Sequence, residues 1–517
     1  MYKFILTSII NLLFVSSIIG QQNTFKNPVI KGDMPDPSII RIDDTYYATG
    51  TSSEWAPHYP MYTSKDLINW TQTGYVFNKK PEWTSNSFWA PELYHHSNGK
   101  VYCYYTARRA SDGISYIGVA TADSPTDEFT DHGLLIEYGT EAIDAFIYDD
   151  NGQLYISWKA YGLDSRPIEL VASKLSKDGL SLEGNVFSLL KDDENIGMEG
   201  QYHFKNGDYY YIVYAAHGCC GPHSNYDVYV ARSKKFRGPY EKFNGNPILH
   251  GGEGDFLSSG HGTAVETPDG RMFFMCHGYL KGEGFYAGRQ PILQEMYVAD
   301  DNWVQFKTGN ITKIEQPMPF SGTVQKGVTD FEDNFNEPEL KLDWIWNYPY
   351  ADADIKVGDG KLILSGKPKT GTDQYNGTAL CLRSQAPDYT YEVSVSNNNQ
   401  SLKGLTMYGD DKNYITLGVI NNSIELGVVR DGKNEDGWEI ASIPPKTPSS
   451  HLKIQVEKGH ILTFYRSDDG KEWIKIIEKS IESSFLVRWD RVARPGLIHI
   501  GKSSQPAEFS HFKLTYK

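Results

Sequence analysis

The chain has 517 residues, of which 50 are lysine or arginine and 65 are aspartate or glutamate, so its formal net charge is −15. An acidic chain without a block of basic residues lacks the charge that nucleic acids and anionic membranes select, and we expect neither as a partner. Its 11 Trp, 35 Tyr and 23 Phe residues, together with its acidic side chains, instead suit a neutral, hydroxyl-rich ligand.

The N-terminal residues have the order of a secretory signal peptide. Lys3 precedes an apolar run over residues 4–19, and Gly20 follows that run. The run is shorter than a membrane-spanning helix needs. We therefore predict a signal peptide over residues 1–20 and a secreted or periplasmic protein.

The cysteines, five in number, are too few to hold together a fold of this size through a disulfide framework. Two of them, Cys219 and Cys220, are adjacent and have no spaced His or Cys partners that would make a zinc site. They either pack as small apolar side chains, which is the interpretation we favour, or form a vicinal disulfide.

Five segments share one pattern: a polar or acidic residue, a short apolar strand, a turn, and an aromatic-rich strand. In four segments the turn carries Asn-Gly or Asp-Gly, the dipeptides that supply positive φ angles to tight hairpins. Each segment therefore predicts a hairpin. The segments begin at Asp36, Glu92, Asp144, Glu199 and His261.

Further strand-like stretches lie between the hairpins, so each repeat holds about four strands, which is the content of a propeller blade. We predict an all-β fold with a five-bladed β-propeller over residues 25–320. A five-rung solenoid is the alternative, but such short repeats in a linear stack would leave open sheet edges. The additional strands are predicted at 116–121, 168–173, 227–233 and 291–298.

The first strand of each propeller blade lines the central channel, so the five starting residues are expected together at one mouth. Crowding of their carboxylates makes it costly to ionise all of them, and one pKa should be pushed upward. Two facing carboxylates, one protonated and one ionised, are the minimum apparatus for hydrolysis of a glycosidic bond. Among the starting residues we interpret Glu92 as structural.

Six motifs follow one another along the predicted propeller: Met34-Pro35-Asp36-Pro37, Trp89-Ala90-Pro91-Glu92, Ile143-Asp144, Met198-Glu199-Gly200, Gly260-His261-Gly262 and Gly288-Arg289. Together they resemble glycoside hydrolase family 43, whose five-bladed propellers act on arabinose- and xylose-containing polysaccharides. The resemblance implies an inverting mechanism, with Asp36 as the general base and Glu199 as the general acid. It gives Asp144 the place of a third acid, which orients Glu199 and modulates its pKa.

The same resemblance implies three further residues of the site. Trp89 corresponds to a platform for a sugar ring, Arg289 to an arginine that reaches the −1 sugar, and His261 to a histidine near the propeller axis. In many family members this histidine binds calcium or a water. The chemistry then requires no cofactor, but a structural Ca²⁺ near His261 is an expectation. Residues 218–227 resemble arabinan-degrading branches, whereas the C-terminal part resembles β-xylosidase branches, which leaves the substrate open.

After Pro317 the chain passes through a glycine-containing linker, and short strand signals recur from residue 331 onward. We predict a β-sandwich over residues 331–517. It resembles the concanavalin-like, jelly-roll domain attached to many family 43 enzymes, which either binds carbohydrate or closes one wall of the active site. Its strands are predicted at 361–365, 391–396, 414–419, 452–457, 461–466, 473–477, 497–501 and 509–516.

The whole chain therefore predicts a secreted O-glycosyl hydrolase of the β-xylosidase or α-L-arabinofuranosidase type. We expect it to release terminal arabinofuranosyl or xylosyl residues from plant polysaccharides or oligosaccharides with inversion. The alternatives are an endo-arabinanase of the same fold and a propeller that binds carbohydrate without chemistry. We expect a monomer whose partner is the glycan substrate.

Overall fold

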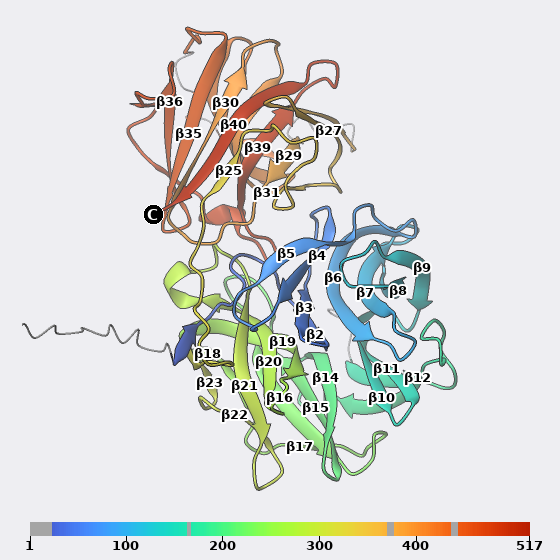
Figure 1. The fold of residues 1–517 in the computed structure, drawn as a ribbon. Coiled ribbons are helices and arrows are strands. Elements are labelled where there is room, and N and C mark those ends of the chain that lie inside the picture. Colours follow the sequence, from blue (N-terminus) through green and yellow to red (C-terminus); the bar gives the residue numbers. More distant parts are fainter. Residues whose placement is uncertain (1–22, 163–166, 370–376, 436–442) are drawn as a thin grey trace, which may run out of the picture.

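The computed structural model describes residues 23–162, 167–369, 377–435 and 443–517, and the predicted signal peptide at 1–20 lies outside them. Figure 1 shows a ring of sheets formed by the N-terminal part, with a pair of sheets formed by the C-terminal part packed against it. The helices of the described residues are the short 3-10 turns η1 (Lys281–Glu283) and η2 (Ser484–Leu486), and none there could cross a membrane. The predicted all-β fold class is confirmed.

Five four-stranded antiparallel sheets form the blades, and the strands of each blade follow one another in chain order. The predicted hairpins form: Asn151 and Gly152, both with positive φ, connect the paired residues Asp150 and Gln153. The strands of blades one and two are β2 (Ser38–Ile42), β3 (Thr45–Thr49), β4 (His58–Ser64), β5 (Thr71–Phe77), β6 (Thr84–His95), β7 (Val101–Arg109), β8 (Ser115–Ala122) and β9 (Thr130–Ile136). Those of blades three to five are β10 (Ala142–Asp150), β11 (Gln153–Ala160), β12 (Glu169–Lys174), β13 (Phe187–Lys191), β14 (Met198–Asn206), β15 (Tyr209–Ala216), β16 (Asp227–Ser233), β17 (Glu241–Lys242), β19 (Phe256–Glu266), β20 (Met272–Leu280), β21 (Gln290–Val298) and β22 (Val304–Phe306).

The inner strands β2, β6, β10, β14 and β19 neighbour one another around the channel, and β19 contacts β2 to close the ring. Two small sheets outside the blades support the closure, one pairing β1 with β24 and the other pairing β18 with β23. The side chain of Asn27 also exchanges hydrogen bonds with the backbone of Leu293 in blade five. The first and last strands of the propeller are thus held together. These strands are β1 (Thr24–Lys26), β18 (His250–Gly254), β23 (Ile311–Thr312) and β24 (Glu315–Pro317).

Two antiparallel sheets form the C-terminal sandwich, and all eight predicted strands overlap strands of these sheets. Several strands of the sandwich are not predicted from the sequence, among them β27, β29, β31 and β33. Strands β31 and β33 contain Gly404, Gly409 and Gly427, which lower strand propensity, and packing overrides that preference. One sheet contains β25 (Phe331–Asp333), β27 (Ala351–Gly358), β28 (Lys361–Pro368), β30 (Tyr389–Ser396), β35 (Ser449–Glu457), β36 (Ile461–Ser467), β37 (Ile474–Lys475), β38 (Ile481–Glu482) and β40 (Ala507–Tyr516). The other contains β26 (Ile345–Trp346), β29 (Thr378–Cys381), β31 (Leu402–Asp410), β32 (Asn413–Ile420), β33 (Ser423–Arg430), β34 (Lys433–Asn434) and β39 (Arg494–Ile500).

The sandwich packs on blade one through a buried apolar cluster, in which Trp55 meets Tyr408, and through buried polar contacts. Ala56 and Trp346 exchange two backbone hydrogen bonds of 2.9 and 2.8 Å, which continue the sheet geometry across the interface. The guanidinium of Arg494 pairs with Asp33 at 2.9 Å, and both side chains are buried. This packing brings the segment before β39 to the mouth of the propeller channel, where the predicted site residues lie.

Candidate active site

Each inner strand, or the segment just before it, contains at least one residue with a left-handed backbone. The φ angles are 54° at Asp36, 42° at Ala90, 59° at Asp144, 58° at Gly200 and 46° at His261. In blades two to five these residues coincide with irregular pairing between the first and second strands. Such bulges re-aim side chains, and they occur often beside active sites. Each of the five sequence repeats therefore places a residue with a left-handed backbone at the mouth of the channel.

This register corrects two of the five predicted starting positions. In blade two the position belongs to Ala90, while Glu92 is buried outside the pocket. Burial raises the pKa of Glu92 well above its ordinary value, which keeps the carboxyl neutral. In blade four the position belongs to Gly200, and Glu199 precedes it. The sequence pattern could not show that the position moves by one or two residues, because a bulge can add a residue to a strand without requiring a particular amino acid there.

A single pocket with about 400 Å³ of space free of protein atoms contains the predicted residues. Its charged and polar lining consists of Asp36, Asp144, Glu199, His261, Arg289 and Asp490. Its less polar walls are made by Trp89, Ala90, Ile143, Cys219, Cys220 and Trp489. All six site residues predicted from the sequence thus meet in one cavity, and two of the residues that complete it, Trp489 and Asp490, come from the sandwich.

Asp36 is held as a carboxylate by several neighbours. Its Oδ2 accepts a hydrogen bond of 2.7 Å from the hydroxyl of Thr51, and its Oδ1 lies 3.4 Å from a guanidinium nitrogen of Arg289. The backbone N–H of Asp36 donates to Nδ1 of His277 at 3.1 Å. Burial alone would raise the pKa of Asp36, but Arg289, His261 and His277 together hold it well below the ordinary value. Asp36 is therefore ionised and only weakly basic in the resting site. It can accept a proton from a water that becomes more acidic as it attacks the substrate.

Glu199 is bonded at both of its carboxylate oxygens. Its Oε2 lies 2.6 Å from the ammonium of Lys159, and its Oε1 accepts a hydrogen bond of 2.6 Å from the hydroxyl of Tyr226. Burial favours the neutral acid, but Lys159 and then Tyr226 outweigh it and lower the pKa of Glu199. Sequence reasoning missed both neighbours. Lys159 could have been noticed as a lysine within the otherwise apolar end of strand β11.

We expect one of the crowded acids to have a raised pKa, and this acid is Asp144. Burial and the nearby Glu199 raise the pKa of Asp144 to about 6, although His261 and Lys159 oppose the shift. Its Oδ2 accepts a hydrogen bond of 3.2 Å from the backbone N–H of Gly200, the residue after Glu199. Asp144 therefore both carries a proton in mildly acidic solution and fixes the backbone beside Glu199.

His261 lies between two of the acids. Its Nδ1 is 3.5 Å from Oδ1 of Asp36 and 3.9 Å from Oδ2 of Asp144. Calcium prefers six to eight oxygen ligands, and within the ranges that the structure describes no group of three or more His, Cys, Asp or Glu residues could hold a metal ion. A structural Ca²⁺ near His261 stays a prediction, and we derive no step from a metal.

The sandwich contributes an aromatic ring and a carboxylate that sequence reasoning did not find. The ring of Trp489 meets that of Trp89 edge to face at 5.8 Å, and Asp490 accepts hydrogen bonds from Nε1 of Trp89 and from the hydroxyl of Ser53. Trp89 is 8% exposed and Trp489 is 42% exposed. The ring with the larger accessible face is therefore that of Trp489.

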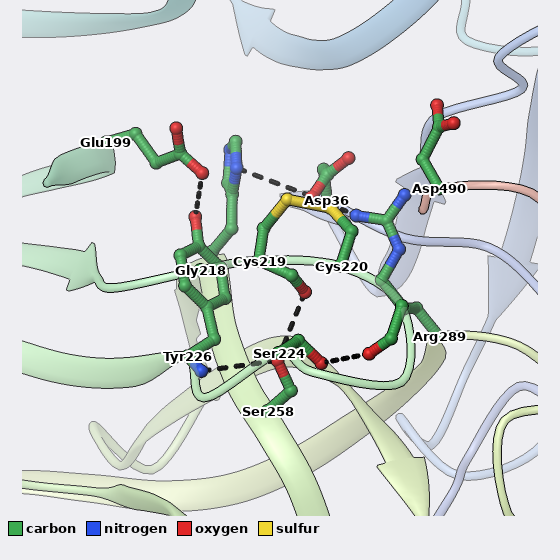
Figure 2. Close-up of a disulfide and its surroundings, with 12 residues drawn as sticks. Asp36, Glu199, Gly218, Cys219, Cys220, Ser224, Tyr226, Ser258, Arg289 and Asp490 are labelled. Carbon is green, nitrogen blue, oxygen red and sulfur yellow. Dashed lines mark hydrogen bonds and ion pairs between the residues drawn. A yellow bond between two sulfur atoms is a disulfide. The ribbon is translucent and has the colours of Figure 1, made fainter. Parts of the chain in front are cut away.

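Cys219 and Cys220 form a vicinal disulfide, which corrects our preference for simple packing. Cys103, Cys276 and Cys381 are free and buried, so this is the one disulfide of the chain. Figure 2 shows the disulfide at the crest of its loop, between Glu199 on one side and Arg289 and Asp490 on the other. The sequence alone could not distinguish a disulfide from two packed thiols, because both states have the same two adjacent cysteines.

The ring of five blades, with an acid-lined pocket closed by a sandwich domain, defines a glycosidase of the propeller class. Residues 25–304 match the family model for glycosyl hydrolases family 43, and residues 332–514 match the β-xylosidase C-terminal concanavalin A-like domain. The chain belongs to glycoside hydrolase family 43 and is a hydrolase of that family. The predicted family, enzyme class and accessory domain are confirmed.

Similar proteins cover both domains. A xylan 1,3-beta-xylosidase from a Vibrio species is 27% identical over 494 residues, which cover 88% of this chain and 90% of that protein. The non-reducing end alpha-L-arabinofuranosidase BoGH43B from Bacteroides ovatus is 28% identical over 433 residues, with 78% and 77% of the two chains covered. The solved structure of Bacteroides ovatus xyloglucan PUL GH43B has a TM-score of 0.81 at 22% identity and covers 96% of this chain and 100% of that one, which shows a common fold.

Proposed function

We propose that the protein is an exo-acting, inverting glycosidase that releases terminal xylosyl or arabinofuranosyl residues from plant polysaccharide fragments. The observation that carries the proposal is that Asp36 and Glu199 share one pocket, which Trp489 and Asp490 help to enclose. A pocket that has a wall from the sandwich on one side suits the end of a glycan chain, whereas an endo-acting enzyme needs a groove that is open at both ends. Xylosidases and arabinofuranosidases among the relatives support the two sugars.

In the proposed reaction Asp36 removes a proton from water as the water attacks the anomeric carbon, while Glu199 protonates the leaving glycosidic oxygen. The low pKa of Asp36 keeps it ionised in neutral and mildly acidic solution. Glu199 and Asp144 titrate as a pair, because the charge of each affects the other. The pKa of Asp144 is about 6, so the pair keeps one proton in mildly acidic solution, and this proton is the one that Glu199 donates. Substrate that displaces water from Glu199 favours the neutral acid.

The test is product analysis on aryl β-xylosides, aryl α-L-arabinofuranosides and arabinoxylan oligosaccharides, with NMR of the first anomer released. Inversion and release of monosaccharide from the start are expected. Glu199→Gln and Asp36→Asn should each lower kcat by about 100-fold or more while the melting temperature stays close to that of the wild type. Retention of configuration, or loss of viscosity of linear arabinan before any monosaccharide appears, would overturn the proposal.

We also propose that the protein is exported and acts as a monomer. The apolar run at 4–19 and the disulfide within the pocket both suit an oxidising compartment. N-terminal sequencing of the mature protein from culture fractions and its mass by light scattering test the two parts separately.

A further inference from the structure

We infer that the Cys219–Cys220 disulfide is a binding surface for the sugar, forming an apolar wall against which a face of the bound glycosyl unit packs. Both cysteines line the pocket, and both are half-buried, so their surface is open to a ligand and to small reagents. The inference rests on the proposed function for its ligand class, a neutral monosaccharide unit. It adds a contact that neither the acids nor the tryptophans supply.

The loop that carries the disulfide turns its polar groups away from the pocket. The carbonyl of Cys219 accepts a hydrogen bond from the hydroxyl of Ser258 at 3.1 Å, and the N–H of Gly221 donates to the hydroxyl of Tyr279 at 3.0 Å. The carbonyl of Gly221 accepts a hydrogen bond from the hydroxyl of Ser224 at 2.7 Å. These bonds leave the side chains of the two cysteines as the part of the loop that faces the cavity.

The loop is also fixed against the sandwich. Gly221 has a φ of 78°, and a Cβ atom there would lie 3.1 Å from Cα and from the carbonyl oxygen of Trp489. The loop next to the disulfide is therefore packed closely against the segment that carries Trp489. A fixed wall loses little conformational entropy when a ligand binds.

The chemistry of the wall matches a sugar face. A pyranose or furanose ring presents C–H groups on its faces and hydroxyls at its edge, and the pocket places charged groups at Asp36, Glu199 and Arg289 for the hydroxyls. Two sulfur atoms in one small ring are polarizable and poor hydrogen-bond partners, so they suit the C–H face. Reduction would replace this rigid surface by two mobile thiols.

A second role for the loop must be separated from this one. The loop ends at Tyr226, whose backbone N–H donates to Ser258 and whose hydroxyl donates to Glu199. If the disulfide acted only by positioning Tyr226, its loss would change kcat and shift the pH profile of kcat/KM. A sugar wall instead predicts a change in KM with the pH profile unchanged.

The test compares the oxidised wild type, the wild type reduced by a water-soluble phosphine, and a Cys219→Ala, Cys220→Ala double variant. The phosphine gives two electrons to the disulfide and becomes a phosphine oxide, and two protons from water complete the two thiols. No other disulfide exists in the chain, so the reagent has one target. Mass spectrometry verifies reduction. The Ser224→Ala variant is the control, since it loosens the loop without changing the sulfur surface.

We expect KM to rise roughly three- to tenfold in the reduced protein and in the double variant, with kcat changed by less than about twofold. The double variant should not respond to phosphine, and Ser224→Ala should keep KM within about twofold of the wild type. Calorimetry with free xylose and free arabinose should show the same weakening. Unchanged KM and sugar affinity after verified reduction, or an equal loss in Ser224→Ala, would overturn the inference.

These outcomes are distinct from failure of the proposed function. An oxidised wild type that hydrolyses none of the glycosides would refute the proposed function, whereas the calorimetry would still decide whether the disulfide contributes to sugar binding. Normal hydrolysis by the wild type with no effect of the double variant would refute the disulfide inference alone.

Discussion

Replacing Lys159 by methionine should move the basic limb of the pH–rate profile to higher pH. The ammonium of Lys159 lies 2.6 Å from Oε2 of Glu199, and the two side chains are 4% and 15% exposed. The pair is thus shielded from solvent, and Lys159 is the largest influence that lowers the pKa of Glu199 against the effect of burial. Methionine keeps most of the length of the lysine side chain but removes its charge. Burial would then dominate, and the pKa of Glu199 would rise.

An opposite charge at this range depresses a carboxyl pKa by about 1–3 units, and losing it corresponds to about 1.4–4 kcal/mol at the general acid. A general acid acts in its protonated form, so kcat/KM falls as pH rises through its pKa. We therefore expect the basic limb of Lys159→Met to lie about 1–3 pH units above that of the wild type. Initial rates with an aryl glycoside over a pH series measure the shift.

The surface pair of Lys191 and Glu169 in the same blade provides the control. Their charged atoms are 3.6 Å apart, but Lys191 is 61% exposed, so solvent screens the pair. Lys191→Met should leave the profile in place. A basic limb of folded Lys159→Met that stays within about 0.3 pH units of the wild type, or that moves to lower pH, would refute the roles assigned to Lys159 and Glu199.

Three further outcomes are expected. Gly200→Ala should lose about 100-fold or more in kcat, because a Cβ at Gly200 would lie 2.5 Å from Cγ of His261; Gly207→Ala, at a similar φ of 56° with no atom within 4 Å, should lose only about 1–2 kcal/mol of stability. The pKa of Asp144, raised from 3.8 to about 6, means that the folded state binds this proton more tightly, so its stabilising effect is present below pH 3.8 and is lost as pH rises through 6. The free energy of unfolding of Asp144→Asn in urea should therefore rise by about 2–3 kcal/mol relative to that of the wild type between pH 4 and pH 8. A difference that does not change with pH would contradict the raised pKa. Trp489→Ala should raise KM by roughly tenfold in the same aryl glycoside assay, and wild-type KM would show that its ring does not face the sugar.

The sequence predicts the ring of blades well because each repeat carries its own local signals. Asn-Gly and Asp-Gly turns fix the hairpins, and aromatic-rich second strands mark the repeat, so the architecture follows from short-range patterns. The site is harder to predict. A bulge shifts the register by one or two residues, which is why Glu92 stands in the buried wall of the ring and Ala90 at the pocket. The difference depends on tertiary closure of the ring.

Residues that are far apart in the sequence were beyond prediction for a different reason. Asp490 is 401 positions from Trp89, and no local pattern links the two, yet one accepts a hydrogen bond from the other. Lys159 and Tyr226 meet at Glu199 from different strands or loops, and each alone is an ordinary residue of its segment. Pairings of this kind follow only from the assembled fold.

The contacts of Asp33 make the sandwich part of the active site. Its Oδ1 accepts a hydrogen bond of 3.0 Å from the backbone N–H of Arg289, and its Oδ2 pairs with the sandwich residue Arg494 at 2.9 Å. Burial raises the pKa of Asp33 although both arginines oppose it, so the charge of Asp33 depends on the domain interface. A buried carboxylate that loses one partner is strongly destabilised. Since Arg289 also holds the ionised form of Asp36, a disturbance of the interface reaches the proposed general base through one shared residue.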